Sequence, residues 1–165
     1  MSDKQQAEEQ QFVEEVGLFF EQSGMPRMTG RILGWLLISD SPHQSTDELT
    51  QTLMASKGSI STTTRLLIRI GLIERISLPG QRHDYFRFKS GAWHRWLKEG
   101  LVQTTTARQL AERGLELLEG KSQLNRQGLE EMRDMYAFFE REFPALLERW
   151  EQERKEKQAI SEVTR

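Results

Sequence analysis

Apolar residues recur every three or four positions over most of the chain, a spacing typical of amphipathic α-helices. The pattern predicts helices over residues 6–22 and 28–39, two short helices that open at Ser45 and at Lys57, and long helices over 90–119 and 124–157. We expect Pro144 to kink or restart the last helix. Between residues 72 and 88 the period changes to two, which predicts strands at 72–78 and 84–88 joined by a loop at 79–83.

The two short helices have clear sequence boundaries. Ser45 and Glu48 have the spacing of a capping box, in which the side chain of each accepts a hydrogen bond from the backbone N–H of the other. Ser56 is a favourable N-cap for the helix over 57–70, and Gly71 stands at the C′ position, where glycine adopts a left-handed backbone most easily. Two short helices, a glycine stop and a hairpin predict a winged helix-turn-helix.

The predicted fold class is therefore mainly α with a small β-hairpin, as a winged helix-turn-helix domain with N- and C-terminal dimerisation helices. We expect an N-terminal dimerisation helix at 1–24 and a winged helix-turn-helix DNA-binding domain at 25–89. A helical dimerisation region at 90–158 and a disordered tail at 159–165 complete the predicted division.

The distribution of charge singles out the predicted helix-turn-helix and wing. Residues 55–98 contain nine Lys/Arg and two Asp/Glu, whereas residues 1–54 contain three and nine, and residues 99–165 eleven and fourteen. The net charge of −2 therefore conceals a cationic block inside an acidic chain. This asymmetry indicates a polyanionic partner for one region, and we expect that partner to be double-stranded DNA.

Several classes of function are excluded or disfavoured. The chain has no cysteine, which excludes disulfides, cysteine-based metal sites and thiol catalysis. The three histidines lack the spacing of a metal-binding motif, and no phosphate- or dinucleotide-binding glycine motif is present. We therefore expect no enzymatic activity, no metal and no cofactor. The chain shows no signal peptide, and its longest apolar run is too short to span a bilayer, so we expect a cytoplasmic protein without membrane contact.

In a winged helix-turn-helix the second helix of the motif enters the major groove, so its N-terminal and outward side chains reach bases and phosphates. Short hydroxyl side chains allow close approach, and Lys57 and Arg65 can bind guanine or phosphate. A solvated polar helix face is the alternative interpretation of this surface. The residues predicted to contact DNA from this helix are Ser56, Lys57, Ser59, Ser61, Thr62 and Arg65.

Four further residues are candidates for contacts outside the recognition helix. Arg82, at the tip of the predicted wing, is suited to the minor groove or to phosphate, and His83 beside it can add charge at mildly acidic pH. Arg27 and Arg31 lie near the start of the second predicted helix. They either contact the DNA backbone or pair with glutamates of the first helix.

Five segments within residues 24–88 form a pattern that occurs, in the same order, in a known family. They are Gly24-Met25-Pro26-Arg27, Gly30-Arg31-Ile32-Leu33-Gly34, Ser56-Lys57-Gly58-Ser59-Ile60-Ser61, Gly71-Leu72-Ile73-Glu74-Arg75 and Pro79-Gly80-Gln81-Arg82. In these segments the chain resembles the GbsR-like branch of the MarR-like bacterial transcription regulators. The resemblance implies a homodimeric winged-helix repressor whose terminal helices form the dimer interface and whose DNA binding a small effector often modulates. Thr62-Thr63-Thr64 departs from the pattern, since relatives tend to carry longer or charged side chains there.

Both terminal regions carry apolar stripes that a small winged helix cannot bury alone. These stripes predict a homodimer, which would bind two half-sites on DNA. The alternative is an intrachain helical cap on a monomer. The stripes consist of Phe12, Val16, Phe19 and Phe20 in the first helix and Phe139, Phe143, Leu146 and Trp150 in the last.

A small-molecule effector is a further expectation. Aromatic side chains can enclose a quaternary ammonium group through cation–π attraction, although aromatics at helical spacing are more often core residues. The candidate cage consists of Phe19, Phe20, Trp35, Trp93 and Trp96. The alternative function for the whole chain is a winged-helix protein–protein interaction module with a coiled-coil arm, which a weak dependence of binding on salt would favour.

Overall fold

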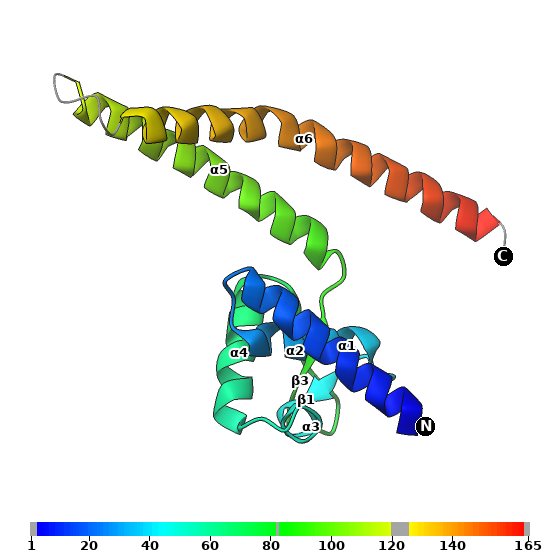
Figure 1. Cartoon of the computed structure of the whole chain (residues 1–165). Helices are drawn as coiled ribbons and strands as arrows, with labels where there is room; N and C mark the ends of the chain where they lie inside the picture. The colour runs from blue at the N-terminus through cyan, green and yellow to red at the C-terminus, as the bar shows by residue number, and fades with distance from the viewer. Residues whose placement is uncertain (1–2, 82, 120–125, 164–165) are drawn as a thin grey trace. The chain divides into compact units, whose positions relative to one another are not determined.

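The computed structural model describes residues 3–81, 83–119 and 126–163. The chain divides into two compact units, Met1–Trp93 and His94–Arg165, and Figure 1 shows the elements of each. Most of the described residues are helical, and a small antiparallel sheet lies in the first unit. This composition confirms the predicted fold class, and it matches the expected order of helices and hairpin.

The first unit begins with two helices, α1 (Asp3–Gln22) and α2 (Arg27–Ile38), which pack closely against each other. A Cβ atom at Gly30 would lie 2.2 Å from the carbonyl oxygen of Val16, so the two backbones touch at a distance that only glycine permits. Val13 and Phe20 of α1 are buried in the same core as Leu33 of α2. The first helix is therefore part of the first unit, whereas the sequence predicted a separate segment at 1–24.

The helix-turn-helix consists of α3 (Thr46–Thr52) and α4 (Lys57–Arg69). The predicted capping box is present: the Glu48 backbone N–H donates to the Ser45 hydroxyl over 3.2 Å, and the Ser45 N–H donates to the Glu48 carboxylate over 2.6 Å. Hydrogen bonds from the side chain and the backbone N–H of Ser45 to the Glu48 carboxylate hold its pKa below the ordinary value. Gly71 ends α4 with a φ of 75°, as the sequence predicted.

The sheet contains β1 (Gln44–Ser45), β2 (Ile73–Ser77) and β3 (Asp84–Phe88) in the order β1-β3-β2, all antiparallel. The register pairs Ile73 with Phe88 and Ser77 with Asp84, which confirms the predicted hairpin. The sequence did not predict β1, because two residues are too few to show an alternating pattern. Through β1 the hairpin is tied to the start of α3.

The core of the first unit lies where α2 meets α4 and the sheet. Ile32 and Leu33 of α2 are fully buried, and α4 contributes Ile60 and Leu67, which lie on one face of the helix. Leu37, at the end of α2, is exposed. Because α4 buries the face that carries Ile60 and Leu67, it presents its opposite face to solvent.

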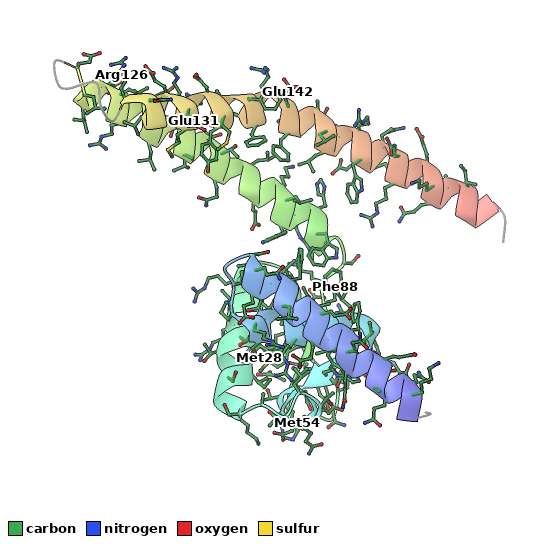
Figure 2. All side chains as sticks on the ribbon, in the orientation of Figure 1. Met28, Met54, Phe88, Arg126, Glu131 and Glu142 are labelled. Atoms are coloured by element: carbon green, nitrogen blue, oxygen red, sulfur yellow. The ribbon has the colours of Figure 1, made fainter. Side chains whose placement is uncertain are left out.

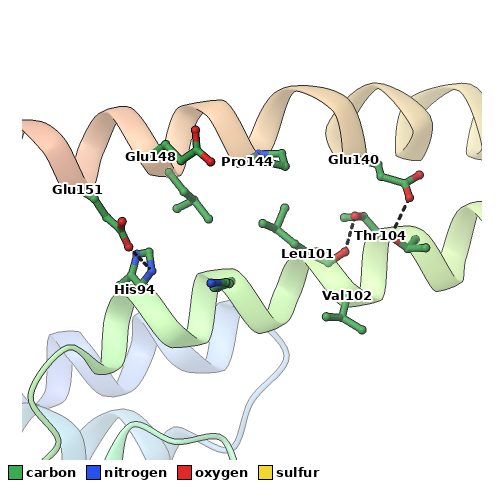
Figure 3. Close-up of a pocket in the computed structure, with 11 residues that line it drawn as sticks. His94, Leu101, Val102, Thr104, Glu140, Pro144, Glu148 and Glu151 are labelled. Carbon is green, nitrogen blue, oxygen red and sulfur yellow. Dashed lines mark hydrogen bonds and ion pairs between the residues drawn. The ribbon is translucent and has the colours of Figure 1, made fainter.

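The second unit contains most of α5 (Ala92–Leu117) and all of α6 (Arg126–Val163). Two ion pairs join these helices, and the residue nearer the start of α5 pairs with the residue further along α6. His94 pairs with Glu151 at 2.7 Å, and Arg108 pairs with Glu140. The helices are therefore antiparallel, and Figure 3 shows the pair between His94 and Glu151. Among the described residues of this unit, only two apolar side chains are buried, those of Ala111 and Leu115 in the last part of α5.

Two expectations for the last helix need correction. The helix continues through Pro144, so the restart that the sequence allowed there is wrong, and the kink stays a prediction. Residues 159–163 are helical, whereas the sequence predicted a disordered tail at 159–165. The boundary between the units falls after Trp93 and not after residue 89, because Ala92 is buried in the core of the first unit.

Candidate nucleic-acid interface

The outward face of α4 is cationic and contains no acidic residue. The helix carries Lys57, Arg65 and Arg69, all exposed, and its sequence has no Asp or Glu. Ser61 and Thr62 are exposed on the same helix, while Ser59 is half-buried. Thr63 and Thr64, by contrast, are buried and belong to the core. The exposed polar groups with which α4 can approach a polyanion are therefore hydroxyls and cations, without a carboxylate.

Lys57 has an acidic partner that the sequence did not predict. Its ammonium nitrogen lies 2.6 Å from Oδ1 of Asp47 in α3. The hydrogen bond and the positive charge of Lys57 lower the pKa of Asp47 from its ordinary value, with a smaller contribution from His83. Both side chains are well exposed, so water screens the pair and its strength is small. Lys57 can therefore exchange Asp47 for a DNA phosphate.

Ser56 and Arg65 also have partners on their own helix. The Ser59 backbone N–H donates to the Ser56 hydroxyl over 3.2 Å, so Ser56 is the N-cap of α4 and keeps only its own O–H for another acceptor. Arg65 Nε donates to the Ser61 carbonyl over 3.1 Å, which holds the arginine against the helix surface. Its remaining guanidinium donors have no acidic partner among the described residues.

The wing carries two ion pairs between its strands. Arg87 pairs with Glu74 at 2.7 Å and Arg75 with Asp84 at 3.3 Å, so both arginines are already neutralised by neighbours. Arg82 lies outside the described residues. His83 is exposed on the wing loop, and its effect on the pKa of Asp47 links the loop electrostatically to the start of α3.

Arg27 and Arg31 both bind Glu14 of α1, which is the second of the two roles the sequence allowed. Arg27 Nη2 donates to the Glu14 carboxylate over 2.8 Å, and Arg31 Nε lies 2.7 Å from the same group, close enough for an ion pair but not aligned as a hydrogen bond. Arg31 Nη2 also donates to the Leu53 carbonyl over 3.0 Å. These two arginines therefore fix α1 to α2 and to the end of α3, and their predicted DNA contact remains a prediction.

The aromatic residues of the predicted cage occupy different surroundings. Phe19 is 64% exposed, and its ring contacts Phe20, which is in the core. Trp93 contacts Phe88 with ring centroids 5.7 Å apart. Trp35 lines a cavity in the first unit, and Trp96 belongs to the second unit. The cage would need both units, and it remains a prediction.

Two properties of the described residues bear on other functions. These residues contain no group of three or more His, Asp or Glu side chains arranged to hold a metal ion. None of the helices within the described ranges is both long and apolar enough to cross a membrane.

Comparison with known proteins identifies the family. HTH-type transcriptional regulator MmpR5 of Mycobacterium tuberculosis (strain ATCC 25618 / H37Rv) is 39% identical to this chain over 142 residues, 86% of each sequence. The chain belongs to the MarR family of transcriptional regulators. A model of the MmpR5-like MarR family matches residues 91–153. A crystal structure of a transcriptional regulator is 38% identical, with a TM-score of 0.76, and the match covers 88% of this chain and 99% of that one.

This MarR-family protein is therefore a DNA-binding transcription regulator and not an enzyme. The MarR-like part of the resemblance is confirmed. The matching family model describes an MmpR5-like group, and assignment to the GbsR-like branch remains a prediction. The family explains why a cationic, hydroxyl-rich helix and a hairpin occur in one compact unit.

Proposed function

We propose that this MarR-family regulator is a sequence-specific repressor whose helix α4 enters the major groove of its operator. The main support is the outward face of α4, which combines exposed Lys57, Arg65 and Arg69 with exposed hydroxyls and has no acidic residue. Arg65 is the best placed to read a base, since its terminal guanidinium nitrogens are available. The wing loop, including Arg82 and His83, rests on the backbone or in the minor groove.

We also propose that the repressor is a homodimer formed through its second unit. The described part of this unit buries few apolar side chains and leaves many exposed, which leaves its apolar surface too large for one protomer to cover. Two protomers would present two recognition helices to two half-sites. The exposed apolar residues on these helices include Leu97, Val102, Leu110, Leu117, Phe138 and Leu146.

We propose further that a small effector modulates DNA binding. We also propose that the protein acts in the cytoplasm, where it meets DNA. Repression is the direction that we infer from the resemblance to MarR-like regulators. An effector would act by binding one conformation of the first unit more tightly than another.

The test is fluorescence anisotropy with a duplex from the region upstream of the protein's own gene and with a scrambled duplex. We expect tighter binding to the native duplex, with an affinity that falls steeply as salt rises. Arg65→Ala should weaken binding to the native duplex by about 1–3 kcal/mol if Arg65 reads a base. The loss on the scrambled duplex should be smaller.

The matched control is Arg113→Ala, which removes the same charge from an exposed position on α5. It should leave the preference for the native duplex unchanged. If Arg65→Ala weakens binding to both duplexes equally, Arg65 contacts phosphate and not a base. If wild-type protein binds neither duplex at low salt, the proposed function is wrong.

A further inference from the structure

The turn between α3 and α4 contains a buried carbonyl group whose partner is a side chain from α2. Leu53, the C-cap of α3, is 2% exposed, and no backbone N–H of the described residues donates to its carbonyl oxygen. Arg31 of α2 takes that place, since its Nη2 donates to the Leu53 carbonyl over 3.0 Å. Met54, labelled in Figure 2, follows with a φ of 47°, and α4 begins at Lys57. A donor from α2 therefore holds the chain just before it turns into α4.

The guanidinium of Arg31 is itself held by two other elements. Its Nε lies 2.7 Å from Oε1 of Glu14 in α1, and its Nη1 donates to the sulfur of Met28 in α2 over 4.0 Å. The Arg31 side chain is 19% exposed, compared with 44% for Arg27, which shares the Glu14 carboxylate. Arg31 therefore has a fixed place between α1, α2 and the turn, whereas Arg27 lies at the surface.

The first helix leaves room for the stem of this arginine at Gly17. A Cβ atom at Gly17 would lie only 2.9 Å from Cγ of Arg31. The guanidinium is planar, with its donors fixed relative to one another, so its orientation beside Glu14 also sets the direction of Nη2. The packing of α1 on α2 therefore determines where the donor meets the Leu53 carbonyl.

We propose that Arg31 is a positioning residue for DNA recognition, which fixes the turn before α4 and thereby the direction in which α4 presents its side chains, without touching DNA. This inference rests on the proposed function in making α4 the helix that enters the major groove. Lysine cannot replace the arginine, because it presents one nitrogen in place of the separate Nε and Nη2 that face Glu14 and Leu53. Without Nη2 the buried Leu53 carbonyl loses its donor, and the turn moves to find another.

Two substitutions separate this role from a contact with phosphate. Arg31→Lys keeps the charge, yet it should lower the ratio of affinities for the native and the scrambled duplex about 3- to 10-fold, because a displaced α4 misplaces its contacts with bases. Arg31→Met removes the charge and should lower the ratio as much. On the scrambled duplex its slope of log affinity against log salt should stay that of the wild type. Partial unfolding would lower both affinities alike and leave their ratio unchanged.

A contact between Arg31 and a phosphate predicts a different result. Arg31→Lys would then bind nearly as the wild type does, and Arg31→Met would lose affinity equally on both duplexes, with a salt slope smaller by about one. That result would overturn the proposal. An unchanged ratio of affinities in both variants would overturn it as well.

Arg27 provides the matched control. It binds the same Glu14 carboxylate as Arg31, but the bonds described for it do not include the turn. Arg27→Lys should therefore keep the wild-type ratio of affinities. Equal losses in Arg27→Lys and Arg31→Lys would mean that the bond to Leu53 is not the cause, and they would contradict the proposal.

The position of the turn can also be measured without DNA. The N–H groups of Met54 and Ala55 donate within the turn, so Arg31→Lys should shift their signals in a ¹⁵N–¹H spectrum, and Arg27→Lys should not. If the wild-type protein binds neither duplex, the proposed function fails, and these shifts still decide whether Arg31 fixes the turn. Unmoved Met54 and Ala55 signals in Arg31→Lys would overturn the inference even if the protein binds its operator.

Discussion

At the scale of single residues, the turn between the two reading helices contains the least favourable backbone among the described non-glycine residues. Met54 has a φ of 47°, and its side chain is 85% exposed, so no burial offsets the left-handed conformation. The N–H groups of Met54 and Ala55 donate to the carbonyls of Gln51 and Thr50, which is a common end for a helix that terminates in glycine.

Replacing Met54 with glycine should therefore stabilise the first unit. We expect Met54→Gly to raise the free energy of unfolding by about 0.5–1 kcal/mol, because left-handed backbone is strained in other residues. Gly71→Ala places a side chain on a left-handed backbone with a φ of 75° and should lower the free energy of unfolding by about 1–2 kcal/mol. Denaturant unfolding measures both. A loss of stability in Met54→Gly would mean that the methionine side chain contributes contacts in solution that outweigh the strain.

At the scale of elements, the contact between α1 and α2 is the closest backbone approach around any described glycine. Besides the Val16 carbonyl oxygen, a Cβ at Gly30 would meet the carbonyl carbon of Val16 at 2.7 Å and the Cα of Gly17 at 2.8 Å. All three are backbone atoms, so no side-chain rotation relieves the overlap. The helices would have to separate.

Gly30→Ala should lower the free energy of unfolding of the first unit by about 1–3 kcal/mol, the usual cost of overpacking. Gly58→Ala is the control, since the nearest atom to its added Cβ is 3.9 Å away and alanine favours the helix. That variant should gain about 0.5–1 kcal/mol. Urea unfolding followed by circular dichroism compares the two, and equal stabilities would contradict the close approach of α1 and α2.

Local signals made some elements predictable from the sequence and left others hidden. The capping box at Ser45 predicted the start of α3 and Gly71 predicted the end of α4, because caps act within a few residues. The membership of α1 in the first unit depends on Gly30 facing Val16, which is a tertiary contact without a local pattern. The ion pair of Lys57 with Asp47 joins two helices, so only the fold reveals it.

At the scale of the whole molecule, apolar surface on the second unit predicts self-association. Leu146 of α6 is half exposed, and it lines a groove with Phe138, Phe139 and Phe143. Because the protomer does not bury Leu146, a charge at this position should leave the protomer folded. The same charge would be costly inside an interface between two copies.

We therefore expect Leu146→Glu to raise the dimer dissociation constant about 10-fold or more, as for a residue at the centre of an interface. Gln127→Glu adds the same charge at an exposed polar position of α6 and should have no effect. Sedimentation equilibrium gives both constants, with circular dichroism to verify folding. If Leu146→Glu has the dissociation constant of the wild-type dimer, the interface does not include this groove.

The ion pair between Lys57 and Asp47 has a consequence for how binding data on this regulator are interpreted. A cation that neutralises a phosphate displaces a condensed counterion, and the slope of log affinity against log salt counts the ions released. Lys57 is paired with Asp47 in the free protein, so a transfer of Lys57 to a phosphate, as we propose, would leave Asp47 to recruit a cation from solution. The same holds for Arg75 and Arg87 of the wing. The salt slope will therefore undercount the phosphates that this protein contacts.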